Sequence, residues 1–383
     1  MAVNFSIDQT DKISKANKQE IIKSLTLSEK VDLLLLKLTR VPVAEKIFFV
    51  QNLGIMLKAG VPLLNAMQTL SRQSQNKRFV KILKETSNAV EKGKSLHESL
   101  KLNEAVFGEL FIYMVEAGEV SGRLESVLEQ IYVQMKKQHE LVSKVKGALT
   151  YPLVVLFAMG GIGIFMLVAV IPKLTDMLKE FNTQLPFATR MLLLVSDTLA
   201  NHGIVALIIV VILGFIFSKI LQTFKGKYYF QSILLKLPVL SPIIKKINLA
   251  KFARTMASLL KTDIMIVKSF QITANVLGNL HYRLVFEDIS KKIQKGVTIN
   301  EIMKTYPHLF PPIVTEMIAI GEQTGELDNI LQDLAEFYEN EVDQIMTSLP
   351  SIIEPILILF LGSAVGAMAV AIIMPMYSIA GGT

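Results

Sequence analysis

Three long runs without a charged residue dominate the hydrophobic pattern of this 383-residue chain. They occupy residues 147–172, residues 198–218 and the end of the chain from Pro355 to Thr383. A helix of roughly 17–25 residues is enough to cross a bilayer. The pattern therefore predicts three transmembrane helices.

The polar regions before the first and third runs have the periodicity of amphipathic helices. Apolar residues recur there at spacings of three and four positions, and β-type alternation is scarce. Gly60-Val61-Pro62, Gly93 and Gly296 are typical of helix ends. We therefore predict an all-α fold with two homologous cytosolic helical bundles, about six helices in each, and three transmembrane helices. The expected core stripes are Leu124, Val127, Leu128, Ile131, Met135, Val142 and Val145 in the first bundle, and Leu327, Ile330, Leu331, Leu334 and Phe337 in the second.

The two polar regions are copies of one segment. Gly118 corresponds to Gly321 at an offset of 203 residues (321 − 118 = 203), and the same offset relates the other matched positions without a gap. Each copy ends in an apolar run, so we expect two similar modules, each attached to a membrane helix. The further matches are Glu119 with Glu322, Gly122 with Gly325, Leu124 with Leu327, Lys92-Gly93 with Lys295-Gly296, Phe107 with Phe310, Pro152 with Pro355 and Pro172 with Pro375.

These patterns divide the chain into seven parts. They are an N-terminal polar segment with an amphipathic helix (1–43), a first cytosolic module (44–146), a first span (147–172), an external connector (173–197), a second span (198–218), a basic linker with the second cytosolic module (219–350), and a third span with an external C-terminus (351–383).

The amphipathic part of the N-terminal segment, residues 18–40, has three interpretations. Its apolar face, which includes Leu27, Val31 and Leu34, would most simply pack on the first module. Binding to the membrane surface or to a partner protein is the alternative.

Composition narrows the chemistry. Hydrophobic residues make up 51% of the chain and charged residues 19%, which fits membrane spans combined with sizeable water-facing domains. The chain has no Cys, no Trp and five scattered His, so we expect no disulfide, no metal site, no cofactor and no catalytic thiol. The net charge of +7 is concentrated beside the spans, which favours membrane lipid over nucleic acid as its partner.

The same charges predict the orientation. Lysines precede the first span, and residues 219–261 contain nine basic residues and no acid, whereas the connector is mixed. The polar N-terminus, Met1 to Asn17, lacks the apolar core of a cleavable signal peptide. By the positive-inside rule the N-terminus and both modules are then cytoplasmic, and Thr383 is external.

The most specific repeated motif is Gly118-Glu119-Val120-Ser121-Gly122, which returns as Gly321-Glu322-Gln323-Thr324-Gly325. The simplest interpretation is a structural corner, in which Ser121 and Thr324 cap the following helix and an acid follows each corner. A second interpretation is that Glu119 and Glu322 contact a partner. A third is a cation site shared by Glu119 and Glu125.

Other motifs concern the spans. Tyr151-Pro152 and Glu354-Pro355 are placed to open the first and third spans, with proline in the first helical turn and Glu354 at the membrane interface. Gly362 and Gly366 form a GxxxG motif, which allows close helix packing. Gly93-Lys94-Ser95 lacks the earlier glycine of a phosphate-binding loop, so we expect no nucleotide hydrolysis and no enzyme activity.

Taken together, these features resemble the type II secretion system F and type IV pilus assembly platform proteins of bacterial inner membranes. The resemblance rests on the doubled Gly-Glu-x-x-Gly corner, the Gly60-Val61-Pro62 turn, the Tyr-Pro and Glu-Pro span openings and Pro375, and it covers residues 44–380. Two positions depart from the family pattern. The second copy has Lys261-Thr262-Asp263-Ile264-Met265 in place of the turn, and the first has Phe107-Gly108 in place of a Phe-Pro like Phe310-Pro311.

The resemblance implies a multi-pass inner-membrane platform that couples a cytosolic hexameric ATPase to the insertion of pilin or pseudopilin subunits into a fibre. Its implied partners are that ATPase, the subunits and other inner-membrane assembly proteins, and the GxxxG motif is compatible with a homo-oligomer. The competing classes are a polytopic transporter and a membrane scaffold or receptor with helical domains. A pilus, a secretion fibre and a DNA-uptake filament all remain open.

Overall fold

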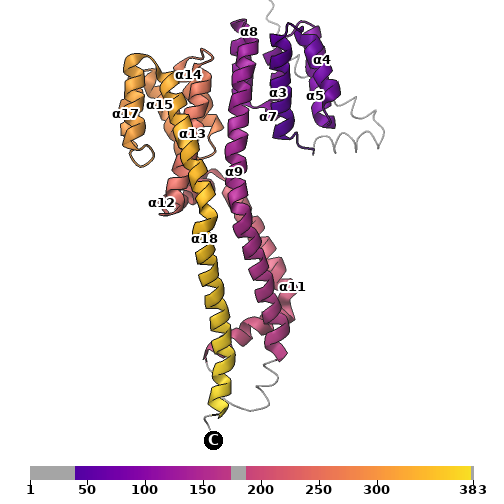
Figure 1. Ribbon diagram of the computed structural model, residues 1–383, viewed down its shortest axis with the longest axis vertical. Helices are drawn as coiled ribbons and strands as arrows, with labels where there is room; N and C mark the ends of the chain where they lie inside the picture. The colour runs from indigo at the N-terminus through magenta and orange to yellow at the C-terminus, as the bar shows by residue number, and fades with distance from the viewer. Residues whose placement is uncertain (1–38, 174–186, 381–383) are drawn as a thin grey trace, which may run out of the picture. The chain divides into compact units, whose positions relative to one another are not determined.

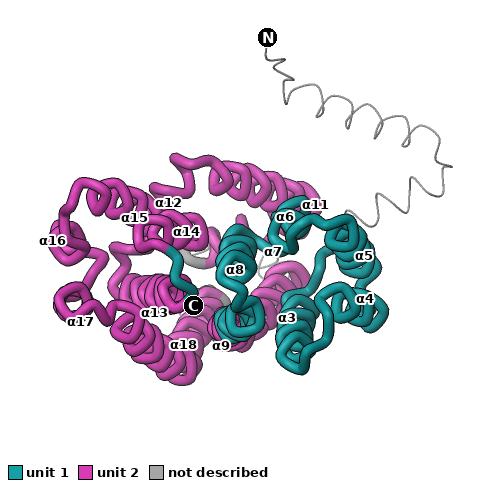
Figure 2. The backbone as a smooth tube through the Cα atoms, turned by 90° about the horizontal axis from the view of Figure 1, so that it is seen from above, with its two compact units in different colours: residues 1–136, 262–264 teal, residues 137–261, 265–383 magenta. Residues whose placement is uncertain are grey.

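The computed structural model describes residues 39–173 and 187–380, without the side chains of 188, 372 and 374–380. Residues 1–38, which hold nearly all of the predicted amphipathic segment, residues 174–186 of the predicted connector and residues 381–383 lie outside this part. All regular structure in the described residues is helical, as the periodicity predicts. Contacts divide the chain into two units, residues 1–136 with 262–264 and residues 137–261 with 265–383, which are described separately (Figure 2).

The helices are short within the modules and long where they lead to the membrane (Figure 1). Up to the connector they are α3 (Val43–Lys58), α4 (Leu63–Gln73), α5 (Lys77–Glu91), α6 (Leu96–Lys101), α7 (Glu104–Phe107), α8 (Glu109–Val120), α9 (Leu124–Phe165) and the π-helix η1 (Met166–Val170). After it come α11 (Phe187–Gln222), α12 (Phe224–Lys236), α13 (Leu240–Leu260), α14 (Ile266–Val276), α15 (Leu280–Ile293), α16 (Ile299–Lys304), α17 (Pro312–Thr324) and α18 (Leu327–Ala380).

Each module has an aromatic core built at equivalent positions. In the first, the rings of Phe49, Phe79 and Phe107 lie with centroids 5.6–6.3 Å apart. In the second, Phe310 lies 6.5 Å from Phe252 and 5.8 Å from Tyr282. The offset of 203 residues relates the three pairs 49 and 252, 79 and 282, and 107 and 310. The core stripes are confirmed in part, because Leu331 and Leu334 are buried whereas Phe337 is half exposed.

Each core has a backbone carbonyl at the same position of the repeat. The side chain that donates a hydrogen bond to this carbonyl is of a different type in each copy. The Lys46 ammonium donates to the carbonyl of Val106 at 2.7 Å, and the Tyr282 hydroxyl donates to the carbonyl of Leu309 at 2.9 Å. Val106 and Leu309 are equivalent positions at the same offset. Burial lowers the pKa of Lys46 and raises the pKa of Tyr282 far above its ordinary value. The fold therefore requires a donor at this place but does not fix which residue supplies it.

The two departures from the family pattern have different outcomes. Gly60 has φ +82°, and Asp263, at the equivalent position, has φ +60°. The second turn thus keeps the left-handed conformation, which an L-residue adopts at a cost. Gly108 has φ +89° and ψ 156°, whereas Pro311 has φ −60° and ψ 152°. With glycine in place of proline, the residue before α8 therefore has a different φ from its counterpart before α17.

Three helices are long and apolar enough to cross a membrane, over Leu124–Lys173, Thr189–Gln222 and Leu327–Ala371. Polar groups join them to one another. The Thr189 hydroxyl of α11 donates to the carbonyl of Ala371 at 2.6 Å, and the Ser196 hydroxyl donates to the carbonyl of Leu167, within η1, at 2.5 Å. A π-helical turn disturbs the regular backbone bonding of a helix, and here a serine of the neighbouring helix binds one of its carbonyls.

The strain at Asp263 can be measured. Asp263→Gly should stabilise the protein by up to about 1 kcal/mol, because glycine removes the left-handed penalty but gains freedom in the unfolded chain. Gly60→Ala should destabilise it by about 1–2 kcal/mol. The measurement is the Tm of the purified full chain in detergent, with Asp263→Asn as a near-neutral control. A lower Tm for Asp263→Gly would contradict the strain.

The carbonyl of Leu309 gives a second prediction. Tyr282→Phe should cost about 1–3 kcal/mol, because it leaves a buried acceptor without its donor. Unfolded tyrosine loses its proton near pH 10 while folded Tyr282 keeps it, so this group's contribution to stability is lost as pH rises above about 10. The variant's Tm should therefore start lower and fall less steeply at alkaline pH. Tyr229→Phe, which removes an exposed hydroxyl, is the control, and equal effects of the two would overturn the assignment.

Candidate functional site

The repeated corner joins α8 to α9 and α17 to α18. Its first glycine lets the two helices approach closely. A Cβ on Gly118 would lie 3.0 Å from the Cβ of Val127, and one on Gly321 would lie 3.1 Å from the Cα of Leu327. The second glycines, Gly122 and Gly325, have φ +68° and +76°. Both glycines of the motif are thus required by the geometry, one for space and one for conformation.

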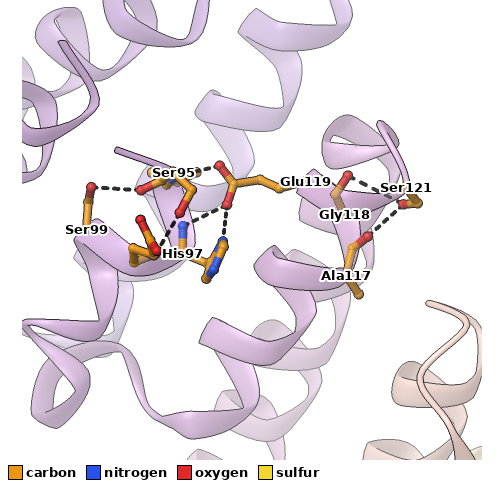
Figure 3. A network of polar contacts seen from close by, with 9 residues as sticks. Ser95, His97, Ser99, Ala117, Gly118, Glu119 and Ser121 are labelled. Carbon is orange, nitrogen blue, oxygen red and sulfur yellow. Dashed lines mark hydrogen bonds and ion pairs between the residues drawn. The ribbon is translucent and has the colours of Figure 1, made fainter. Parts of the chain in front are cut away.

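The glutamate of the first corner binds the N-terminus of α6. Its carboxylate accepts hydrogen bonds from the backbone N–H groups of Leu96 at 2.5 Å and His97 at 2.8 Å (Figure 3). The Nδ1 atom of His97 lies 2.6 Å from the same carboxylate. The first N–H groups of a helix have no partner within it, and the positive end of the helix dipole favours a negative charge there.

The second corner repeats this arrangement. Glu322 accepts from the N–H groups of Ile299 at 2.6 Å and Asn300 at 2.9 Å, at the start of α16. Each short helix also has a hydroxyl cap, from Ser95 in the first module and Thr298 in the second. Ser95 belongs to the Gly-Lys-Ser sequence that resembles part of a phosphate-binding loop. Its hydroxyl caps a helix instead.

The prediction that Ser121 caps the helix after the corner is wrong. Its hydroxyl donates back to the carbonyl of Ala117 at 2.7 Å and so binds the end of α8 (Figure 3). Thr324 likewise donates to the carbonyl of Ile320 at 2.9 Å, although it also accepts a 3.4 Å bond from the N–H of Glu326. A hydroxyl one residue before the left-handed glycine still faces the carbonyl ends of the preceding helix, which explains the difference.

These bonds bear on the three interpretations of the corner. The carboxylates of Glu119 and Glu322 are partly buried and bound within their own modules, as a structural corner requires. In the described ranges no group of three His, Cys, Asp or Glu side chains could hold a metal ion, so the geometry gives no support to a shared cation site. The partner-contact role stays a prediction, and the turn presents other residues for it, such as Val120, which is 83% exposed.

The predicted span residues are placed differently from expectation. Neither proline begins its helix, because Pro152 lies within α9 and Pro355 within α18. Both helices start in the polar modules and run on into the apolar segments, so the prolines interrupt backbone bonding in mid-helix. Glu354, Gly362 and Gly366 are exposed, and a Cβ on either glycine would meet nothing within 4 Å. The GxxxG face of α18 is therefore open.

A buried ion pair that the sequence did not predict joins α13 to α18. The Arg254 guanidinium, whose side chain is 5% exposed, binds both carboxylate oxygens of Glu339 at 2.7 and 2.8 Å. A third bond of 2.9 Å reaches Gln332. The equivalent positions in the first copy are Gln51, Lys136 and Glu129, so the repeat itself gave no signal for the pair.

More contacts join α18 to the middle of α9 and to α13. Lys144 pairs with Asp343 at 2.6 Å, and Lys246 pairs with Glu341. Leu141, Val342 and Met346 form a small buried cluster in the same region. The polar half of α18, just before its apolar half, is thus held by charge pairs and by apolar packing.

Unit 1 has a groove of about 200 Å³ between α3 and α9. Its lining combines apolar side chains with the charged residues Lys58, Glu125 and Glu129. It is lined by Val50, Gln51, Gly54, Ile55, Lys58, Glu125, Leu128, Glu129 and Tyr132.

The role of the corner glutamates can be tested directly. Glu322→Ala should destabilise the protein by about 2–3 kcal/mol, since two partly buried N–H groups at the start of α16 lose a charged acceptor. Glu322→Gln should cost about half as much. Glu326→Ala, at an exposed acid of the same turn, should cost less than about 0.5 kcal/mol. Tm values of the full chain in detergent measure these changes, and equal values for Glu322→Ala and Glu326→Ala would rule out the capping role.

Comparison with known proteins agrees with the repeat. The family model "Type II secretion system (T2SS), protein F" matches residues 49–172 and again residues 252–375. The two matches differ by the same offset of 203 residues (252 − 49 = 203).

Relatives match most of the chain. The type IV pilus assembly protein PilC of Thermus thermophilus is 36% identical over 333 residues, covering 87% of this chain and 82% of its own. PilC of Myxococcus xanthus is 32% identical, with 87% and 80% covered. The type II secretion system protein F of Aeromonas hydrophila is 27% identical, with 87% and 85% covered. On these matches, this chain belongs to the type II secretion system protein F family.

Proposed function

We propose that this protein is an inner-membrane platform that couples a cytosolic assembly ATPase to the insertion of pilin or pseudopilin subunits into a fibre. Three kinds of observation support it. Relatives are named for type IV pilus assembly and type II secretion. The chain has two helical modules of one family, and three helices suited to a membrane. No enzyme activity is part of the proposal.

The observation that carries the mechanism is the continuity of α18. This single helix of 54 residues begins at the second corner and includes the third span. At 1.5 Å per residue it is about 80 Å long. Its polar half is fixed to α13 through Arg254 and Glu339. A displacement of the second module would therefore move the span with it, because a continuous helix transmits both translation and rotation.

The proposed topology places both modules on the cytoplasmic side, where ATP is available. The support is the charge distribution: nine basic residues and no acid in 219–261, against a mixed connector between the first two spans. The connector and Thr383 are then external.

The spans supply a surface for the apolar helices of pilin-type subunits. Phe360 and Val365 on α18 are exposed, and Gly362 and Gly366 between and beside them leave room for close approach. A transporter would instead need polar groups along its path. No Asp, Glu, Lys or Arg occurs in 147–172, 198–218 or 355–383, which disfavours an ion-coupled pump.

Insertion of a flexible segment into α18 tests the coupling. Seven residues of Gly and Ser placed between Leu349 and Pro350 should abolish fibre assembly in the source bacterium, because force no longer passes from the module to the span. Seven alanines at the same place are the matched control, since seven residues are nearly two turns and keep the helix in register.

Three measurements separate the outcomes. Membrane fractionation should show both variants inserted, co-purification should show both bound to the ATPase, and electron microscopy should show many fewer fibres only with the flexible insertion. Equal fibre numbers in the two variants would refute transmission through α18. Failure of the unmodified protein to co-purify with any assembly ATPase would refute the platform function itself.

A further inference from the structure

Helix α12 is fixed to the end of the second span by a tight corner. Thr223 caps α12 by accepting a hydrogen bond from the N–H of Gly226 at 3.2 Å. Gly226 packs so closely on α11 that a Cβ there would overlap the carbonyl oxygen of Ile220. The ring of Phe230 also packs edge-on against Phe217, within the apolar run, at 5.9 Å. The start of α12 therefore stays where α11 leaves the apolar layer.

One face of α12 is bound to the second module. Tyr228 stacks on the ring of His281 at 4.3 Å, and the Ser232 hydroxyl lies 2.9 Å from the Nε2 atom of that histidine. The Gln231 side chain bridges the turn before α15, donating to the carbonyl of Gly278 at 3.2 Å and accepting from the N–H of Leu280 at 2.8 Å. These contacts fix the rotation of α12 about its axis.

The other face of α12 and the turn after it expose large apolar side chains. Tyr229 is 68% exposed and Ile233 60% exposed, one helical turn apart. Leu237, Val239 and Leu240 continue the exposure at 41%, 67% and 40%. Such a run of exposed apolar groups beside a membrane span needs a partner that removes it from water.

The charged residues of α12 are all positive. Lys225 and Lys236 are exposed, and Lys227 is half-buried. No Asp or Glu occurs anywhere in residues 198–262. The two basic residues further along that have strong partners, Lys246 and Arg254, bind acids of α18. The lysines of α12 have no such role among the contacts of the described residues.

We propose that α12 lies on the cytoplasmic membrane surface, with Tyr229, Ile233 and the 237–240 turn at the boundary of headgroups and acyl chains, and that its lysines bind anionic phospholipid headgroups. An apolar helical face flanked by lysine is the pattern of interfacial helices. Each lysine near an anionic surface adds favourable electrostatic energy. The second module is thereby held at a fixed height above the bilayer, through the α12 contacts with α15. The contact with lipid does not depend on the proposed coupling role, and only the side of the membrane rests on the proposed topology.

The absence of tryptophan from the chain allows a direct test. Ile233→Trp introduces a single fluorophore on the proposed lipid-facing side. The full chain is reconstituted into vesicles of phosphatidylcholine with about 30% phosphatidylglycerol, enough to give the surface a negative potential. Matched vesicles contain lipids brominated on the upper acyl chain. We expect brominated lipid to quench the introduced tryptophan by at least half and its emission to be shifted to the blue.

Two control positions calibrate the signal. Ile320→Trp places the fluorophore on α17, at an isoleucine of similar exposure (52%) beside the second corner, where α18 begins about 40 Å along the helix from its apolar run. Its tryptophan should be quenched little. Phe215→Trp, within the apolar run of α11, should be quenched strongly.

Two results would overturn the proposal. If the Ile233→Trp variant behaves like Ile320→Trp while Phe215→Trp is quenched, α12 does not contact the membrane. If the tryptophan of Ile233→Trp is shielded from acrylamide without being quenched by brominated lipid, the face is covered by a second copy of the chain instead.

The charge part is tested separately in the Ile233→Trp protein. In vesicles of phosphatidylcholine alone, the brominated lipid should quench its tryptophan at least twofold less than in vesicles that also contain phosphatidylglycerol. Replacing Lys225, Lys227 and Lys236 by Gln should remove that difference. Quenching that does not depend on phosphatidylglycerol in the parent, or a difference that persists in the triple variant, would overturn anionic lipid as the ligand.

Discussion

The last helix of each module has to serve two environments, and this constraint shapes the rest of the structure. Its first part must present one apolar stripe to a water-surrounded core, and its later part must be apolar on all sides. In α18 the change occurs after Glu354, without an interruption of the helix. The corner before each such helix then sets its direction. That is where the sequence places two glycines and a partly buried carboxylate.

The modules show that a backbone requirement can be met by different residues. At the equivalent carbonyls of Val106 and Leu309, a lysine serves one copy and a tyrosine the other. At the equivalent turns, glycine serves one and a strained aspartate the other. What the copies share at these two places is the buried carbonyl and the positive φ. The backbone requirement at those places is constrained more strongly than the type of side chain that meets it.

Periodicity and the repeat were sufficient to predict the all-α fold, the doubled modules and three membrane helices, because these follow from patterns many residues long. The corner glycines were predictable for the same reason, since both copies carry them. The targets of Glu119 and Ser121 were not, because they depend on which helix end faces each side chain in three dimensions. The placement of Pro152 and Pro355 in a first helical turn was wrong, because each helix begins in its polar module and continues through the proline. The ion pair of Arg254 with Glu339 could not be predicted from the repeat, because the first copy lacks both residues. Only the fold brings residues 254 and 339 together.

The basic residues between 219 and 261 form one cluster in the sequence but have different surroundings in the structure. As a group, those from 219 to 261 give only the prediction that this region lies on the cytoplasmic side. In the structure, two groups among them have different surroundings. Arg254 and Lys246 are directed to acids of α18 and fix the module to the helix that enters the membrane. The lysines of α12 share that helix with an exposed apolar face, and α12 packs against Phe217 and Ile220 at the end of α11 through Phe230 and Gly226. An arginine buried at 5% exposure cannot serve an electrostatic attraction to a surface, and an exposed lysine contributes little to a core. Burial therefore decides which of these charges acts on the protein and which can act on lipid.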